Sequence, residues 1–216
     1  MQRLRDAGPC VQQYYCEASE VIVFGSMSVG LHRTNSDIDV LCIGEREYKM
    51  KSNALDLVVV PVQAINDDAW VQNELATHVA SFGTWVVGKP EWTGRARVGQ
   101  FAVDQKYRRL SRFIDALSKS WFRLNEFFRV KYSVKLCRET QRLILLERGI
   151  PIPPTAILDR VRRSPGSSVE VCERLWEISV SVRQSRFTED LFRRIRACAY
   201  LNDHRPRITG GLSRTN

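Results

Sequence analysis

The stretch of sequence that decides the fold is VIVFGS at residues 21–26, followed by DIDVLCI at residues 37–43. Both apolar runs are short and rich in β-branched residues, which predicts two buried strands. Gly25 ends the first run and lets the backbone come close to an anion, while Ser26 opens a short helical turn whose amide groups attract phosphate. Asp37 and Asp39 stand two residues apart on extended backbone, so both side chains are expected on one face.

A third carboxylate is expected on a neighbouring strand. The run LDLVVVP at residues 55–61 predicts that strand, and Asp56 within it is costly to bury without a partner. Carboxylates that lie side by side repel one another unless a cation separates them, and oxygen ligands with room for phosphate suit Mg²⁺. We therefore predict that Asp37, Asp39 and Asp56 are catalytic and hold two Mg²⁺ ions, or Mn²⁺, for in-line displacement at an α-phosphate.

Together these residues resemble the DNA polymerase β-like nucleotidyltransferase superfamily, specifically its small members with a helical C-terminal half. FGS at residues 24–26, DID at residues 37–39 and Asp56 fill the pattern of that superfamily, and SDID at residues 36–39 is similar to the form common in the small members. The motifs cover about residues 19–61, and a weaker likeness extends over residues 78–88. The resemblance implies a mixed-sheet α+β fold and transfer of a nucleoside monophosphate from an NTP substrate, with loss of pyrophosphate.

The remainder of the chain predicts an edge strand at residues 84–87 and helices from about Phe101 onward. A helix with an apolar stripe from Tyr107 to Phe128 should be followed by one from about Val130 to Arg148, ended by Gly149. Thr155 and Ser167 are expected to cap further helices. We thus expect a nucleotidyltransferase catalytic domain at residues 1–97, an all-helical domain at residues 98–202 and a flexible tail at residues 203–216.

The two parts of the chain differ in charge. Residues 1–100 have 9 Lys and Arg against 12 Asp and Glu, a net charge of −3, whereas residues 101–216 have 24 against 12, a net charge of +12. A basic half attracts phosphates, either of the nucleotide or of a nucleic acid. Residues predicted to contact the NTP are Gly25, Ser26, Arg33, Lys135 and Arg138; the last two belong to a basic stripe on the second long helix, completed by Lys131 and Arg142. A solvated helix face is an equally good explanation of that stripe.

The acceptor is constrained mainly by this charge. A cationic acceptor such as an aminoglycoside is disfavoured, and an anionic one, RNA at its 3′ end, fits best. Nucleotidylation of a protein, such as a partner toxin, or of a small molecule remains an alternative, as does a regulatory module that binds NTP or RNA without turnover. No apolar run suits a membrane span, no secretory signal is visible, and six cysteines without a Cys-x-x-Cys pair favour the cytoplasm.

Overall fold

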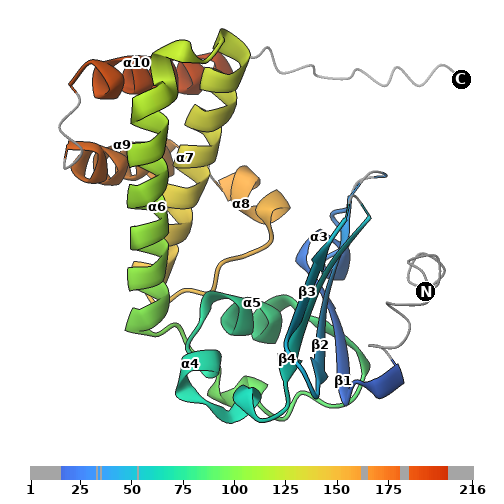
Figure 1. The fold of residues 1–216 in the computed structure, drawn as a ribbon. Coiled ribbons are helices and arrows are strands. Elements are labelled where there is room, and N and C mark those ends of the chain that lie inside the picture. The colour runs from blue at the N-terminus through green and yellow to red at the C-terminus, as the bar shows by residue number, and fades with distance from the viewer. Residues whose placement is uncertain are drawn as a thin grey trace, which may run out of the picture.

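The computed structural model describes residues 16–32, 34, 36–52, 54–161, 165–180 and 185–203. Arg33 and all of the expected tail except Asp203 lie outside these residues. The described chain consists of a mixed five-stranded sheet with short helices, followed by a group of long helices (Figure 1). The fold is therefore of the α+β class, with a mixed-sheet core in the N-terminal part and helices after it, as the sequence predicts.

The sheet has the strand order β3-β4-β2-β1-β5. Strands β2 and β4 are parallel, and the other neighbouring pairs are antiparallel. The predicted edge strand at residues 84–87 is confirmed, whereas β3 at the opposite edge was not predicted. The strands are β1 (Glu20–Phe24), β2 (Ile38–Gly44), β3 (Tyr48–Lys51), β4 (Leu55–Pro61) and β5 (Thr84–Val87).

Alternation along the strands gives the sheet two apolar faces. Ile22 and Phe24 of β1 pack in one cluster with Leu41 of β2, whereas Val21 of β1 packs in another with Val40 of β2. Successive side chains on a strand point to opposite faces, which explains this division. The first face is covered by helices α4 (Asp68–Val71) and α5 (Glu74–Phe82), with the short turns η1 (Ala64–Asn66) and η2 (Thr93–Arg95) around it. The one-turn helix α3 (Gly25–Ser28) follows β1, and its Met27 packs against the other cluster.

The helical part begins with two long helices that lie side by side (Figure 1). They share an apolar core with the later helices, centred on Trp121, Leu136 and Leu175, each almost fully buried. Trp121 is fixed further because its indole Nε1 donates a 2.9 Å hydrogen bond to Asp190. The elements are α6 (Gln100–Ser120), η3 (Trp121–Arg123), α7 (Glu126–Glu147), α8 (Thr155–Val161), α9 (Pro165–Val180) and α10 (Ser185–Asp203).

The helix boundaries differ from those predicted. The apolar stripe from Tyr107 to Phe128 does not form one helix, because the chain turns at η3 and the Asn125 side chain accepts a hydrogen bond from the Phe128 amide to cap α7. Thr155 is the first residue of α8 rather than its cap, and Ser167 lies inside α9. The stop at Gly149 is confirmed, since that residue follows α7 with a φ of 70°.

A small cluster of Ala102, Leu146 and Ile152 lies where the sheet part meets the helical part. It is distinct from the sheet clusters and from the large helical core, and the division between residues 97 and 98 stays a prediction. None of the helices in the described part of the chain is both long and apolar enough to cross a membrane.

Candidate active site

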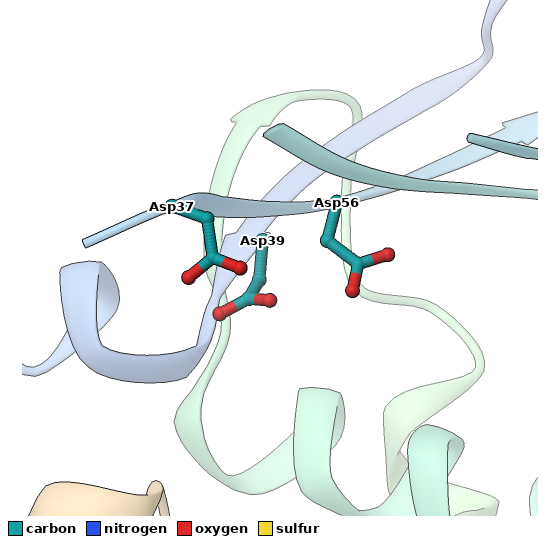
Figure 2. A group of neighbouring side chains, drawn as sticks. All are labelled: Asp37, Asp39 and Asp56. Carbon is teal, nitrogen blue, oxygen red and sulfur yellow. The ribbon is translucent and has the colours of Figure 1, made fainter. Parts of the chain in front are cut away.

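Three carboxylates meet at one end of the central strands. Asp39 on β2 is the register partner of Asp56 on the parallel strand β4, and Asp37 immediately precedes β2. Each of the three offers a carboxylate oxygen within 4.8 Å of the others. Figure 2 shows all three side chains leaving the strands on the same side. The structure thus brings together the acids that the sequence singles out.

The strand pattern explains why these acids leave the sheet on the same face. On β2, Asp39 alternates with Leu41 and Ile43, which belong to the cluster beneath α4 and α5. On β4, Asp56 alternates in the same way with Val58 and Val60, which pack against that cluster or belong to it. The acids therefore point to the side of the sheet that carries the helices.

The surroundings of Asp39 favour its protonated form. Burial, together with the charges of Asp37 and Asp56, raises the pKa of Asp39 to about 6, and the nearby Lys51 offsets only part of this effect. Lys51 forms an ion pair with Asp56 and lies 3.9 Å from Asp37. This lysine is 69% exposed, so it supplies a positive charge to the cluster without filling it.

Gly25 is required by the position of the Asp39 carboxylate. Its φ is +70°, which side chains rarely adopt, and a Cβ built on it would lie 2.0 Å from Asp39 Oδ2. The anion that approaches this glycine backbone is therefore a side chain of the protein itself. Ser26 follows directly, and both residues lie in the one-turn helix α3.

The acids open into a cleft of about 820 Å³ between the sheet and the helical part. Gly25, Ser26, Asp37 and Asp39 form its wall on the sheet side, and the opposite wall comes from α5, α6, α7 and the segment that leads into α8. The residues on that second wall include Glu74, His78, Phe101, Gln105, Arg109, Arg142, Ile152 and Thr155.

Two arginines bring positive charge to this cleft. Arg142 of α7 donates 2.8 Å hydrogen bonds to Glu139 and to the Thr155 hydroxyl, so its guanidinium is held in place. Arg109 of α6 is exposed and lines the same space. The cleft therefore has acids on the sheet side and guanidinium groups on the helical side, an arrangement suited to a metal-bound polyphosphate.

A buried lysine joins the two walls. Lys106 of α6, whose side chain is 6% exposed, lies 2.8 Å from Glu74 of α5 and 3.2 Å from Glu139 of α7. Burial alone would raise the pKa of Glu139, but the charges of Lys106 and Arg142 outweigh that effect and hold the pKa below its usual value. The orientation of Arg142 is thus linked to α5 through a continuous set of ion pairs.

His78 of α5 fixes the segment before α8. Its Nδ1 lies 2.6 Å from the Ile152 carbonyl oxygen, and because a carbonyl can only accept, Nδ1 must donate. Burial lowers the pKa of His78, although the bond to Ile152 and the charge of Glu74 act in the opposite direction. The ring also packs edge-on against Phe24, 5.7 Å between centroids, immediately before Gly25.

Neither basic residue predicted to contact the NTP lines the cleft described here. The Lys135 ammonium lies over the Phe113 ring, 4.8 Å from its centroid, and Arg138 donates to both carboxylate oxygens of Asp159 on α8. From the same stripe, Arg142 is the residue that reaches the cleft. Arg33 lies outside the described residues.

The sequence analysis did not find Lys51, Glu74, His78 or Arg109. A signal for Lys51 was available, because YKMK at residues 48–51 alternates as a strand does and would have placed a lysine beside the acids. No comparable signal marks the other three, since they reach the cleft only through the packing of α5 and α6.

A mixed sheet that ends in three convergent carboxylates, beside a cleft with cationic groups opposite, is an arrangement suited to nucleotide transfer. Residues 9–82 match the family model of the nucleotidyltransferase domain. The matched segment contains Asp37, Asp39 and Asp56 together with the strands β2 and β4, and the match agrees with the resemblance to the polymerase β-like superfamily.

Three solved structures show a partial likeness to this chain. A spectinomycin adenyltransferase from Enterococcus faecialis, solved with ATP and spectinomycin, is 15% identical with a TM-score of 0.45, over 94% of this chain and 96% of its own. A nucleotidyltransferase-like protein from Exiguobacterium sibiricum is 15% identical with a TM-score of 0.39, over 94% and 74%. A toxin–antitoxin structure with AMP-PNP is 20% identical with a TM-score of 0.25, over 56% and 94%.

With TM-scores below 0.5, these likenesses bear on neither the substrate nor the acceptor of this chain. No curated protein matches the sequence.

Proposed function

We propose that this protein transfers a nucleoside monophosphate from an NTP to the 3′ hydroxyl of an RNA and releases pyrophosphate. The observation that carries the proposal is the cluster of Asp37, Asp39 and Asp56, with carboxylate oxygens within 4.8 Å of one another at the edge of a cleft. Such a cluster is unfavourable without cations, as the raised pKa of Asp39 indicates.

The donor set fits divalent cations of the hard type. Asp37, Asp39 and Asp56 offer only oxygen atoms, and phosphate oxygens of a substrate in the cleft would complete an octahedral shell. We assign these residues to two Mg²⁺ ions, with Mn²⁺ as a substitute. When bound, the ions would supply Lewis-acid stabilisation of the charge that develops on the α-phosphate and the leaving group.

Other steps of the proposed reaction are assigned to individual residues of the chain. The attacking hydroxyl forms a bond to the α-phosphorus, the bond to the pyrophosphate oxygen breaks, and Asp56 accepts the hydroxyl proton. Gly25 and Ser26 lie at the α-phosphate end of the cleft in this assignment, and Arg142 and Arg109 contact the β- and γ-phosphates from the opposite wall. Lys135 and Arg138, further along α7, are assigned to the phosphates of the acceptor.

The acceptor follows from charge. Residues 101–216 have a net charge of +12, and Arg109 and Arg142 from this range line the wall opposite the acids, so we expect a polyanion to be attracted to the helical side of the cleft. RNA fits this field better than a cationic small molecule. The cytoplasm, where NTP and RNA are both abundant, is the compartment in which we expect the reaction.

One labelling experiment tests nucleotide and acceptor together. The protein is incubated with each α-³²P NTP, Mg²⁺ and a total RNA and protein extract, with Asp37→Asn as the inactive control. Label that appears on RNA 3′ ends and is absent with Asp37→Asn supports the proposal. Label on a protein or a small molecule would reject the RNA acceptor, and no label with any NTP would indicate a module that binds without turnover.

A further inference from the structure

A group of aromatic rings lies on α6 and α7 outside the cleft, and two of its members, Phe113 and Tyr132, are half-buried against the helical core. The Phe127 and Phe128 rings lie 5.4 Å apart, Phe128 stacks on Tyr132 at 6.3 Å, and Tyr132 meets Phe113 edge-on at 6.0 Å. Phe127 is 69% exposed and Phe128 39% exposed. We call the four rings, together with Lys135 over Phe113, the aromatic ladder.

The aromatic ladder begins next to the cleft. Phe113 is one helical turn along α6 from Arg109, which lines the cleft. Eight residues separate Lys135 from Phe127 along α7, a rise of about 12 Å. A chain that leaves the cleft past Arg109 therefore meets a ring about every helical turn for roughly two or three nucleotides.

Cations accompany these rings, and nearby acids are neutralised. Lys135 lies on the ladder itself, and Lys131 is exposed one turn away on α7. Among the described residues of α6 and α7, Asp115 is paired with Lys119, Glu126 with Arg194, and Glu139 with Lys106 and Arg142. The surface therefore presents two exposed rings, Phe127 and Phe128, beside the exposed cations Lys131 and Lys135.

From this combination we propose that the aromatic ladder binds single-stranded RNA, the acceptor strand of the proposed reaction, by stacking its bases on the exposed rings of Phe127 and Phe128. Aromatic platforms beside cations bind single strands with little sequence preference, because every base has a π-face. A duplex keeps its bases stacked internally and cannot use the rings. The proposal rests on the proposed function in naming RNA as the acceptor.

The test measures binding of fluorescein-labelled, 12-nucleotide RNAs of two unrelated sequences by fluorescence anisotropy across a salt series. The double variant Phe127→Ala with Phe128→Ala should raise Kd by about 10- to 100-fold for both sequences while leaving the salt slope unchanged, because stacking involves no counterion release. Lys135→Ala should instead lower that slope by about 0.7. Trp176→Ala removes a 46% exposed ring on α9 and is the matched control, with an unchanged Kd.

Wild-type-like affinity of the Phe127 and Phe128 double variant, or equal affinity for a duplex of the same sequence, would overturn the proposal. Sedimentation velocity is run on the same variants. If the rings hold a second copy or a protein, their removal changes the assembled state and leaves RNA affinity as it was, which also rejects the ladder.

The labelling experiment separates this proposal from the proposed function. RNA binding that depends on the rings but is followed by no label transfer keeps the ladder and rejects the catalytic assignment. If the double variant binds RNA and transfers label to it as the wild type does, the catalytic assignment is kept and the ladder is rejected.

Discussion

At the scale of single residues, the site is a compromise between charge repulsion and close packing. Asp39 is raised in pKa to about 6 by burial and by its two neighbouring acids, yet its carboxylate is held tightly against Gly25. A raised pKa means that the folded, metal-free protein favours the protonated acid. Its stability therefore falls as the pH rises from about 4, the unfolded pKa, through 6.

Replacing Asp39 by Asn should separate stability from activity. At pH 7 the variant loses one charge of the repelling cluster, so we expect the Tm of the metal-free protein to rise by about 2–6 °C. Nucleotide transfer should disappear, and Mg²⁺ should no longer raise Tm as it does for the wild type. Thermal unfolding with Mg²⁺ and with EDTA measures both effects. Transfer near the wild-type rate would remove Asp39 from the metal site.

Gly25 allows a test with an internal control. Gly25→Ala places a Cβ 2.0 Å from Asp39 Oδ2 at a φ of +70°, whereas Gly30→Ala at a φ of +68° meets nothing within 4 Å. Both substitutions should cost about 1–2 kcal/mol of unfolding free energy from the backbone alone. Only Gly25→Ala should also displace Asp39 and lower transfer by more than about 100-fold. Equal activity of the two variants would show that the close approach is unimportant.

At the scale of elements, ion pairs between helices add to apolar packing in holding α5, α6 and α7 together. Lys106 is placed by α6 between an acid of α5 and an acid of α7. Lys106→Met would leave Glu74 without its cation and Glu139 with Arg142 alone. Because breaking a buried pair costs about 3–5 kcal/mol, we expect a loss of that size in urea unfolding. Adding Glu139→Gln to Lys106→Met should recover part of the lost unfolding free energy. If the losses of the two single variants simply add in the double variant, Lys106 and Glu139 are not coupled.

Asp190 ties α10 to the turn at η3. Burial alone would raise its pKa, but hydrogen bonds from Arg194, Trp121 and Arg193 prevail and hold the pKa of Asp190 well below its usual range. A depressed pKa gives stability that is present above the unfolded value of about 3.9 and is lost as the pH falls below it. Unfolding free energy should thus drop below about pH 4.

Asp190→Asn should remove most of that acid-dependent drop and lower stability at pH 7 by about 3–5 kcal/mol, because Arg194 loses its buried partner. The exposed pair of Asp115 and Lys119 is the control, since Asp115→Asn should change stability by less than about 0.5 kcal/mol at either pH. Chemical unfolding at pH 7 and pH 3.5 compares the three proteins. If all three proteins lose the same unfolding free energy between pH 7 and pH 3.5, a group other than Asp190 causes the acid sensitivity.

At the scale of the whole molecule, the sequence predicts the catalytic half better than the helical half. The spacing of FGS, DID and Asp56 predicts three strands and their acids because alternation and a glycine turn are local properties. Helix ends were less predictable: the apolar stripe past Trp121 continues in sequence, but the Asn125 cap interrupts it. The residues that α5 and α6 bring to the cleft depend on tertiary packing and leave no local pattern.

The cleft itself belongs to both halves, so its nucleotide affinity should depend on a residue far in sequence from the acids. Arg142→Gln removes a guanidinium that Glu139 and Thr155 hold toward the cleft. If it contacts the β- and γ-phosphates, loss of a charge-assisted contact of about 1.5–3 kcal/mol should raise the Kd for a non-hydrolysable NTP with Mg²⁺ by about 10- to 100-fold.

Lys131→Gln is the matched control for this substitution. It removes the same charge from the same helix at an exposed position, so a general electrostatic effect would weaken nucleotide binding equally in both variants. We expect no more than about a twofold change for Lys131→Gln in isothermal titration with the nucleotide analogue. An equal rise in Kd for Arg142→Gln and Lys131→Gln would mean that residues 101–216 act only through their overall positive charge. The triphosphate would then lie outside the reach of Arg142.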